Sequence, residues 1–295
     1  MSIRNLLELI LLAAIWGASF LFMRIATPEF GAVALIEVRV LVASIFLLPI
    51  WILRDAKHQS KLVIGHWPHL LVVGILNSAV PFVLFAYSTL YISGGFSSIL
   101  NATAPIWGAL VAWVWLRATP TFEAAIGLGF GLLGVAILVS KSISLSMGGM
   151  TLGIFAALVA SFMYGIAANY TAEKLNKVAP LSIATFSQIA ASLVLLPAAL
   201  WHFPQQQISA LAWGSVIAMG VFCTGLAYTM YFRLIANIGS SKAITVTFLI
   251  PIFGTLWGVL FIAEEITTEM VLGTGVILFG TALVTGVLSF ARKWG

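Results

Sequence analysis

The sequence predicts an all-α membrane protein of ten transmembrane helices, arranged as two inverted five-helix repeats. Three observations predict this class: the composition, ten apolar runs and an internal repeat. Hydrophobic residues make up 61% of the chain and charged residues 8%, whereas an average soluble domain is about one quarter charged. The mean hydropathy is +1.11. So few charged side chains cannot cover a water-facing surface, and we expect no sizeable soluble domain.

The apolar runs are long enough to cross a bilayer, which takes about 20 residues for a hydrocarbon core of roughly 30 Å. Polar and proline-containing turns such as Thr27-Pro28-Glu29 and Phe203-Pro204-Gln205 separate them. The first run exceeds the apolar core of a signal peptide, so we expect a retained helix. The predicted spans lie near residues 5–26, 32–54, 68–91, 94–117, 121–140, 150–172, 180–201, 210–235, 240–263 and 267–290.

The two halves of the chain repeat one another. Residues 92–121 align without a gap with residues 238–267, so that Asn101 falls on Thr247 and Pro105 on Pro251. The same offset aligns the glycines of the fifth and tenth spans, Gly127, Gly129 and Gly134 with Gly273, Gly275 and Gly280. We predict two units, residues 1–145 and 146–295. Because five spans is an odd number, the second unit is inverted, as in secondary transporters whose central site opens alternately to each side.

Positive charges predict the orientation, because Lys and Arg favour the cytoplasmic side of short loops. With the N-terminus inside, that side receives Arg4, Arg54, Lys57, Lys61, Arg117, Lys174, Lys177, Arg233, Lys242, Arg292 and Lys293, and the other side only Arg24 and Lys141. We predict an inner-membrane protein with both termini in the cytoplasm. The net charge of +5 is scattered and forms no patch, so we expect no nucleic-acid partner.

Several short motifs resemble a known family. They are Trp16-Gly17-Ala18-Ser19-Phe20, Arg39, the Asn101 and Pro105 pair, and Phe261-Ile262-Ala263-Glu264. Together with the ten spans and the repeat, they resemble the drug/metabolite transporter superfamily, its EamA-like branch, and within it the YddG-type exporters of aromatic and other amino acids. The resemblance implies a cavity lined by the first, third, fourth, sixth, eighth and ninth spans. The sixth span departs from the pattern, with Phe162-Met163-Tyr164 in place of a tryptophan motif.

Polar and aromatic side chains inside the predicted spans are candidates for substrate binding, because such groups are costly in a bilayer and often functional. The alternative is ordinary packing, with interhelical hydrogen bonds and lipid-facing rings. The predicted substrate-binding residues are Trp16, Asn77, Ser78, Phe82, Asn101, Tyr164, Thr224, Tyr228, Thr247 and Trp257. Three prolines, Pro81, Pro105 and Pro251, form with Arg39 the predicted helix-kink and gating set, and Pro105 and Pro251 lie at matching points of the repeat.

Charged residues near the spans leave alternatives open. Arg39 has either a gating or substrate-carboxylate role or a structural one, and Glu37 does not share its helix face. Arg24 is expected to anchor at the membrane interface. Lys242 either marks topology or meets an anionic substrate. Glu37 is the only carboxylate well inside a span, so obligatory proton coupling has little support.

No constellation for catalysis or metal binding is present at membrane depth. The four histidines lie near loops or a helix end, and the single cysteine, Cys223, allows no intrachain disulfide. We expect no enzyme activity, cofactor or metal. The glycines of the fifth and tenth spans predict a scaffold or a homodimer surface. The leading hypothesis is export of neutral amino acids, with another metabolite or a lipophilic cation as alternative cargo. Different classes are a non-transporting membrane subunit and an intramembrane enzyme.

Overall fold

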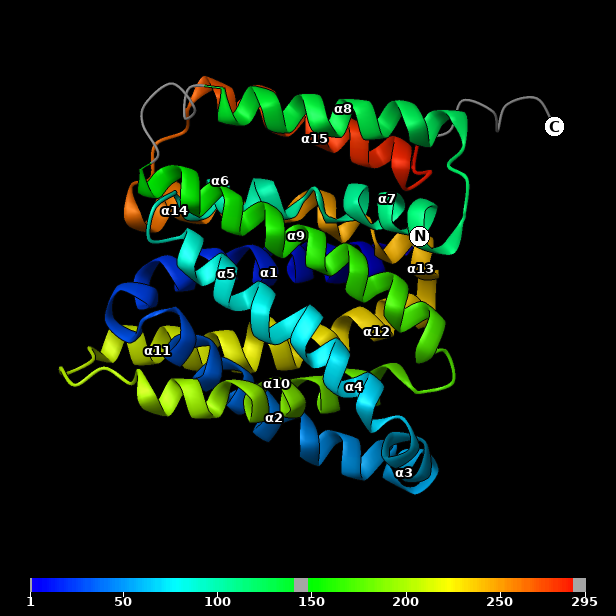
Figure 1. Ribbon diagram of the computed structural model, residues 1–295, viewed down its shortest axis with the longest axis vertical. Coiled ribbons are helices and arrows are strands. Elements are labelled where there is room, and N and C mark those ends of the chain that lie inside the picture. The colour runs from blue at the N-terminus through cyan, green and yellow to red at the C-terminus, as the bar shows by residue number, and fades with distance from the viewer. Residues whose placement is uncertain (1, 141–147, 289–295) are drawn as a thin grey trace.

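The computed structural model describes residues 2–140 and 148–288, and within these ranges every regular element is a helix (Figure 1). Eight helical stretches are long and apolar enough to cross a membrane, and α14 and α15 are shorter apolar helices of 17 residues each. The chain is a multi-pass membrane protein. In chain order the elements are α1 Ile3–Phe30, α2 Ala32–Arg54, α3 Ala56–Gly65, α4 Trp67–Val73, η1 Gly74–Ala79, α5 Val80–Ser88, α6 Gly94–Asn101, α7 Ala104–Leu116, α8 Phe122–Val139, α9 Gly149–Lys174, α10 Pro180–Trp201, α11 Ala210–Ala218, η2 Met219–Leu226, α12 Ala227–Ile238, α13 Ser240–Ala243, α14 Val246–Ile262 and α15 Thr268–Val284.

The helices lie roughly side by side, and the chain turns back at alternate ends of the bundle (Figure 1). We call the end that holds the start of α1 the N-terminal side; α3 and the linkers after α7 and α9 lie there, on the right of Figure 1. The opposite end, the far side, holds the α1–α2, α5–α6, α10–α11 and α14–α15 junctions. The predicted charges Lys141, Arg292 and Lys293 lie outside the described residues.

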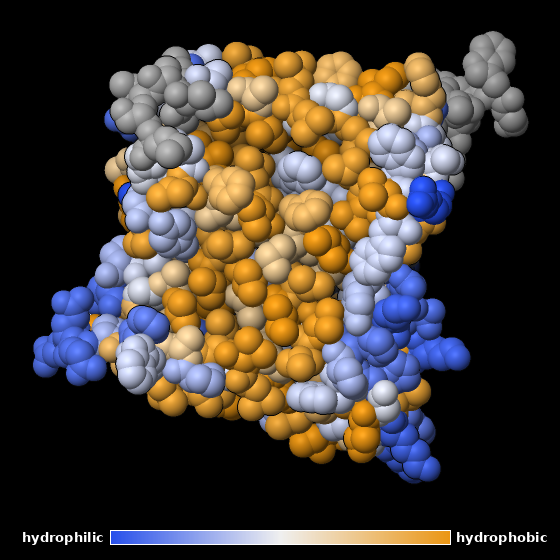
Figure 2. Space-filling view, in the orientation of Figure 1, coloured by the Kyte–Doolittle hydropathy of each residue, from blue (hydrophilic) through white to orange (hydrophobic). Residues whose placement is uncertain are grey.

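Large apolar side chains cover the outside of the bundle. Figure 2 shows a hydrophobic band between the two sides, with hydrophilic residues gathered at both edges. Individual residues are highly exposed, for example Leu53 and Trp201, each at 86%. In water such a surface would be unfavourable, since soluble proteins rarely expose large apolar patches. In a bilayer the same band faces lipid.

Two helix pairs show how the halves meet. Ser192 on α10 donates to Glu37 Oε1 at 2.6 Å, and Trp51 Nε1 donates to Ser182 Oγ at 2.8 Å. The start of α2 thus lies against the end of α10, so the two helices are antiparallel. Helices α8 and α15 also pair along their glycines: a methyl group on Gly127 would lie 2.6 Å from the Gly280 carbonyl oxygen. Small residues let these helices approach closely.

Corresponding glycines occupy corresponding contacts in the two halves. A methyl group on Gly17 would lie 2.8 Å from the Gly254 nitrogen, and one on Gly165 would lie 2.7 Å from the Gly108 nitrogen. We call such corresponding residues mates. Gly254 follows Gly108 by 146 residues and Gly165 follows Gly17 by 148. These contacts set the register between the first and sixth spans and make Tyr164 the mate of Trp16.

The structure breaks two predicted spans. The span predicted at 94–117 consists of α6 and α7, with Ala102 and Thr103 between them, and Pro105 lies in the first turn of α7. The span predicted at 240–263 begins with the short α13, and Pro251 lies inside α14. Proline fits the first turn of a helix, where its missing N–H has no partner to lose. Between the predicted spans 32–54 and 68–91, the chain forms the additional helix α3.

Candidate functional site

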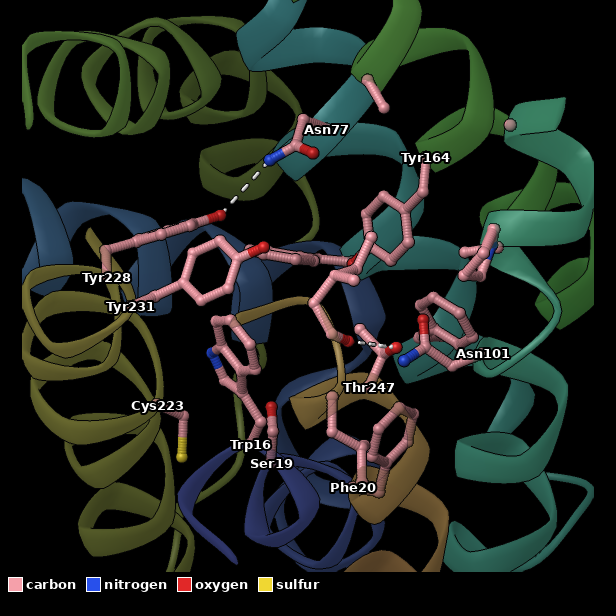
Figure 3. Close-up of a pocket in the computed structure, with 18 of the residues that line it drawn as sticks. Trp16, Ser19, Phe20, Asn77, Asn101, Tyr164, Cys223, Tyr228, Tyr231 and Thr247 are labelled. Atoms are coloured by element: carbon pink, nitrogen blue, oxygen red, sulfur yellow. Dashed lines mark hydrogen bonds between the residues drawn. The ribbon is translucent and has the colours of Figure 1, made fainter. Parts of the chain in front are cut away.

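A cavity of about 650 Å³ lies between the two halves (Figure 3). Its walls come from α1, α2, η1, α5, α6, α7, α9, η2, α12 and α14, with the end of α15. The family resemblance predicted that six of the ten spans line the cavity. In the structure the second span, through Arg39, and the tenth span line it as well. Apolar and aromatic side chains dominate the lining, and a few polar groups converge among them, as is typical of ligand sites.

The cavity is blind on the far side and accessible from the N-terminal side. Lining residues toward the far side, Met23, Arg39 and Phe85, are at most 4% exposed. Lining residues toward the N-terminal side, such as Ala168 near the end of α9 and Ile244 before α14, are exposed or half-buried. A molecule can therefore enter from the N-terminal side and meets a closed wall beyond Met23.

Wide helical turns shape the middle of the cavity. The π-helices η1 and η2 occupy corresponding places in the two halves, and π-turns often mark functional sites. Asn77 lies on η1 and Thr224 on η2. Thr224 Oγ1 donates to the carbonyl of Met219, five residues earlier, at 3.1 Å, which satisfies a carbonyl of the wide turn. In the first half Pro81 lies in the first turn of α5, two residues after the π-turn.

Glycine 220 brings α2 close enough for Arg39 to reach the cavity. A methyl group on Gly220 would lie 2.9 Å from the Arg39 carbonyl oxygen, so only glycine fits this contact. Arg39 Nε donates to Thr224 Oγ1 at 3.1 Å, and the guanidinium carbon lies 3.9 Å from the centre of the Phe82 ring. The side chain is 4% exposed, and its Nη1 donates to no described residue.

Aromatic rings form the wall around this guanidinium. Trp16 packs against Tyr231 with ring centres 5.2 Å apart, and Phe85 packs against Tyr164 at 5.7 Å. Asn77 Nδ2 donates to the Tyr228 hydroxyl at 3.3 Å, the dashed line at the top of Figure 3. Rings of this kind give apolar contact and hydrogen-bonding tips together.

Most of the predicted substrate-binding residues meet in this cavity. The mates Asn101 on α6 and Thr247 on α14 both line the cavity, as do Trp16 and Ser19 on α1 (Figure 3). The lining residues that the sequence predicted are Trp16, Asn77, Phe82, Asn101, Tyr164, Thr224, Tyr228 and Thr247, with Arg39 and Pro105 from the predicted gating set. Their role in binding stays a prediction.

The other predicted residues lie elsewhere. Ser78 Oγ accepts from Gln188 Nε2 at 2.8 Å in a fully buried contact with α10. Trp257 Nε1 donates to the Ala14 carbonyl at 2.9 Å and so holds α14 against α1. Pro81 and Pro251 are absent from the cavity wall, and Lys242 is exposed on α13. Ser78 and Trp257 thus hold neighbouring helices together outside the cavity lining.

Several lining groups with polar atoms lie outside the predicted substrate-binding set, among them Ser19, Asn169 and Thr285. Ser19 is 5% exposed, and its Oγ has no described partner. Asn169 Nδ2 donates to the carbonyls of Gly108 and Gly165, both at 2.9 Å, and fastens α9 to α7. Tyr231 on α12 also lines the cavity, three residues after Tyr228 and therefore on the same helix face.

The wall on the far side is held by polar contacts. Both oxygens of Glu264 accept from the first N–H groups of α6: Oε1 from Gly94 at 2.7 Å and Oε2 from Gly95 at 3.1 Å. An Arg24 Nη1 group donates to the carbonyl of Thr89 at the end of α5. These contacts join α1, the α5–α6 turn and the α14–α15 linker, which closes the far side.

A membrane-embedded helical bundle with a central cavity that is blind at one side has the form of a transport protein. The family model of the EamA-like transporter family matches twice, over residues 5–140 and 151–286. The chain therefore belongs to the EamA-like transporter family and is a membrane transporter.

Relatives agree with this class and do not name a cargo. An uncharacterized transporter of Archaeoglobus fulgidus is 24% identical over 281 residues, which cover 94% of this chain and 96% of that protein. The uncharacterized transporter YvbV of Bacillus subtilis is 24% identical, with 95% and 91% covered. Protein PagO of Salmonella typhimurium is 25% identical, with 82% and 80% covered. A solved crystal structure superimposes with a TM-score of 0.67 at 15% identity, over 98% of this chain and 99% of that one, which shows the fold alone.

Proposed function

We propose that this transporter exports neutral amino acids, especially aromatic and hydrophobic ones, and related small metabolites, as YddG-type exporters do. The observation that carries the proposal is the cavity wall: Trp16, Tyr164, Tyr228 and the rings around them surround a few amide and hydroxyl groups. An apolar side chain fits against the rings, and the polar groups suit the amino-acid backbone. The volume of about 650 Å³ accommodates such a molecule.

We further propose transport by alternating access between two inverted five-helix repeats. The double match of the family model and the antiparallel α2 and α10 pair support this arrangement. Equivalent halves can exchange conformations, so that a cavity open to one side becomes open to the other. The positive charges on the N-terminal side, such as Arg54, Arg117 and Lys177, support an inner-membrane orientation with both termini in the cytoplasm. In that orientation the cavity faces the cytoplasm, as an exporter needs when it loads.

Transport is expected without an imposed proton gradient. Glu37 Oε1 accepts from Ser192 on α10, and Glu37 does not line the cavity. A proton relay normally uses a titratable group inside the substrate pathway. We therefore expect substrate to equilibrate across the membrane along its own gradient.

The test is transport of a labelled amino-acid panel by liposomes that contain the purified protein, with and without a pH gradient. We expect phenylalanine and leucine to equilibrate in both conditions, and empty liposomes to show no uptake. Replacing Tyr228 by alanine should lower the apparent affinity for phenylalanine on the order of tenfold, because a buried ring is lost. Tyr228→Phe keeps the ring and serves as the control. No saturable transport of any amino acid would refute this cargo.

The alternative cargo is another metabolite or a lipophilic cation. The aromatic wall favours the cation to some extent, because cations bind ring faces. The same liposomes with a labelled lipophilic cation distinguish the two: saturable cation uptake that amino acids do not inhibit favours the alternative.

A further inference from the structure

We propose that Arg39 binds the carboxylate of the transported molecule, so that the cavity selects aromatic or large apolar monocarboxylates over amines that lack a carboxyl group. The inference rests on the proposed function, because it names the group by which this transporter holds its substrate. Its basis is a buried guanidinium with an unused donor that lines the cavity.

Arg39 is held in place but is only partly satisfied. Its Nε donates to Thr224 Oγ1, and its face lies on the Phe82 ring. Nη1 is buried and donates to no described residue. A guanidinium offers five N–H groups in a planar fork that matches a carboxylate. The two contacts that exist fix the fork in position and leave donors for a ligand.

Within the described part of the chain, no carboxylate lines the cavity to face that charge. Among the described lining residues Arg39 is the only charged side chain. Glu37, two residues before it, accepts from Ser192 on α10. Glu8 on α1 pairs with Arg233 at 2.8 Å. A buried charge without a partner is costly in a bilayer, and an anionic ligand would remove that cost.

The wall around Arg39 limits what the anion can be. One guanidinium supplies a single positive charge, its face lies on the Phe82 ring, and Phe85 and Tyr164 add rings to the same cavity wall. One charge balances one carboxylate, whereas a phosphate dianion would keep a net negative charge among aromatic side chains. A cation that lacks a carboxylate would meet the positive charge of Arg39 directly. The wall therefore favours a monocarboxylate with an apolar side chain.

A second unused polar atom suits the other end of an amino acid. Ser19 Oγ is buried in the cavity and has no described partner. Figure 3 shows Ser19 on α1 close to Trp16, on the opposite side of the view from Asn77. A hydroxyl oxygen accepts from an ammonium group, and an indole face also attracts one. A zwitterionic amino acid could thus use Arg39 and this region together.

The experiment measures binding to the purified wild-type transporter with four probes that share a phenyl ring. They are phenylalanine, 3-phenylpropionate, phenethylamine and phenyl phosphate, and binding is followed by tryptophan fluorescence and thermal stabilisation. We expect the two carboxylates to bind and phenethylamine to bind at least about tenfold more weakly, since one charge-assisted bond is lost. Phenyl phosphate that binds as tightly as 3-phenylpropionate would overturn the selection for carboxylates.

Variants of Arg39 test the residue itself. Arg39→Gln should weaken binding of 3-phenylpropionate at least about tenfold and leave phenethylamine unchanged or tighter, whereas Arg39→Lys should recover part of the affinity. Arg233→Gln, which removes an arginine outside the cavity, is the control. If Arg39→Gln does not fold, binding of the four probes to the wild-type protein still tests whether the cavity selects carboxylates. Equal binding of phenethylamine and 3-phenylpropionate would overturn the inference even if phenylalanine is transported. If phenylalanine does not bind but 3-phenylpropionate binds through Arg39, the proposal of amino-acid export is refuted, whereas carboxylate binding by Arg39 is supported.

Discussion

The two sides of the bundle are built from mates, yet one is closed and the other is open. On the far side α6 and α14 touch: a methyl group on Gly254 would lie 2.6 Å from Ser98 Cβ. The mates of these residues are Gly108 and Ile244, and both line the cavity. A methyl group on Gly108 would meet only Gly165 within 4 Å, at 3.9 Å. The fourth and ninth segments thus form a wedge that is open toward the N-terminal side.

The polar contacts follow the same division. Glu264 caps α6 on the far side, and its mate on the N-terminal side is Ala118. Arg24 donates to the Thr89 carbonyl, and the mate of Arg24 is Ala172. A carboxylate at a helix N-terminus and a cation at a helix C-terminus both stabilise their contacts. The chain can make these contacts on one side only. Sequence differences between the two similar halves therefore determine which side is closed.

Among the substitutions that test why the far side is closed and the N-terminal side is open, Glu264→Ala is expected to have the largest effect. The change removes two charge-assisted hydrogen bonds, and each is worth up to about 1.5–3 kcal/mol before screening by partial exposure. We expect the far side to open more often. The reporter is Ser98→Cys in a Cys223→Ser background, labelled with an impermeant maleimide added on the far side; its labelling rate should rise about tenfold or more.

The neighbouring carboxylate supplies the control. Glu265 is exposed, and Glu265→Ala removes the same charge without touching α6. Glu264→Gln, which keeps one acceptor oxygen, should lie between the wild type and Glu264→Ala. A labelling rate for Glu264→Ala equal to that of Glu265→Ala would show that the cap does not hold the far side closed.

A smaller effect is expected from the same substitution at two mates, Gly254→Ala and Gly108→Ala. Both replace glycine by alanine within a helix, which alone favours the helix by about 1 kcal/mol. At Gly254 the methyl group would lie 2.4 Å from Ser98 Oγ, whereas at Gly108 it has room. We expect Gly254→Ala to destabilise the packing of α6 against α14 on the far side by about 1–3 kcal/mol. Gly108→Ala should be neutral or slightly stabilising.

Thermal unfolding of the two purified variants in detergent makes this comparison. The apparent Tm of Gly254→Ala should fall below that of Gly108→Ala, and its transport rate should fall as well. Equal melting temperatures would mean that the tight contact between α6 and α14 contributes little to the closed side.

Hydropathy predicted the bundle well because a bilayer imposes one length on every apolar helix. Apolar runs near 5–26 and 180–201 correspond to α1 and α10 with small shifts at the ends. The breaks within spans were less predictable, because a proline can start a helix or lie inside it. Pro105 and Pro251 align in sequence, but only Pro105 directly follows a break. Neighbouring packing decides between these outcomes.

The site residues that could be predicted from sequence are those whose residue type alone indicates a place in the cavity wall. Aromatic rings at membrane depth, such as Tyr164 and Tyr228, line the cavity. The π-turn of the second half has no proline to indicate it, since Ala227 stands at the place of Pro81. In the sequence, Glu264 ends one of the motifs that indicate the family resemblance, and that motif predicts no contact for its carboxylate. Its role as a cap depends on α6, about 170 residues earlier in the chain, and no local pattern contains that contact.

The smallest effect is expected from Arg24→Leu. This side chain is half-buried and donates one hydrogen bond to the Thr89 carbonyl, so its loss should cost about 1 kcal/mol and raise Ser98→Cys labelling a few-fold. Arg24→Lys keeps a donor and a charge and should stay near the wild type. Arg24 and Glu264 line the same pocket on the far side, so the two contacts are expected to depend on each other. In a double-mutant cycle, Arg24→Leu should then add less to Glu264→Ala than it does alone, because residues in one network are not additive. Strict additivity would mean that two independent contacts hold the far side closed, and that they do not form one coupled network.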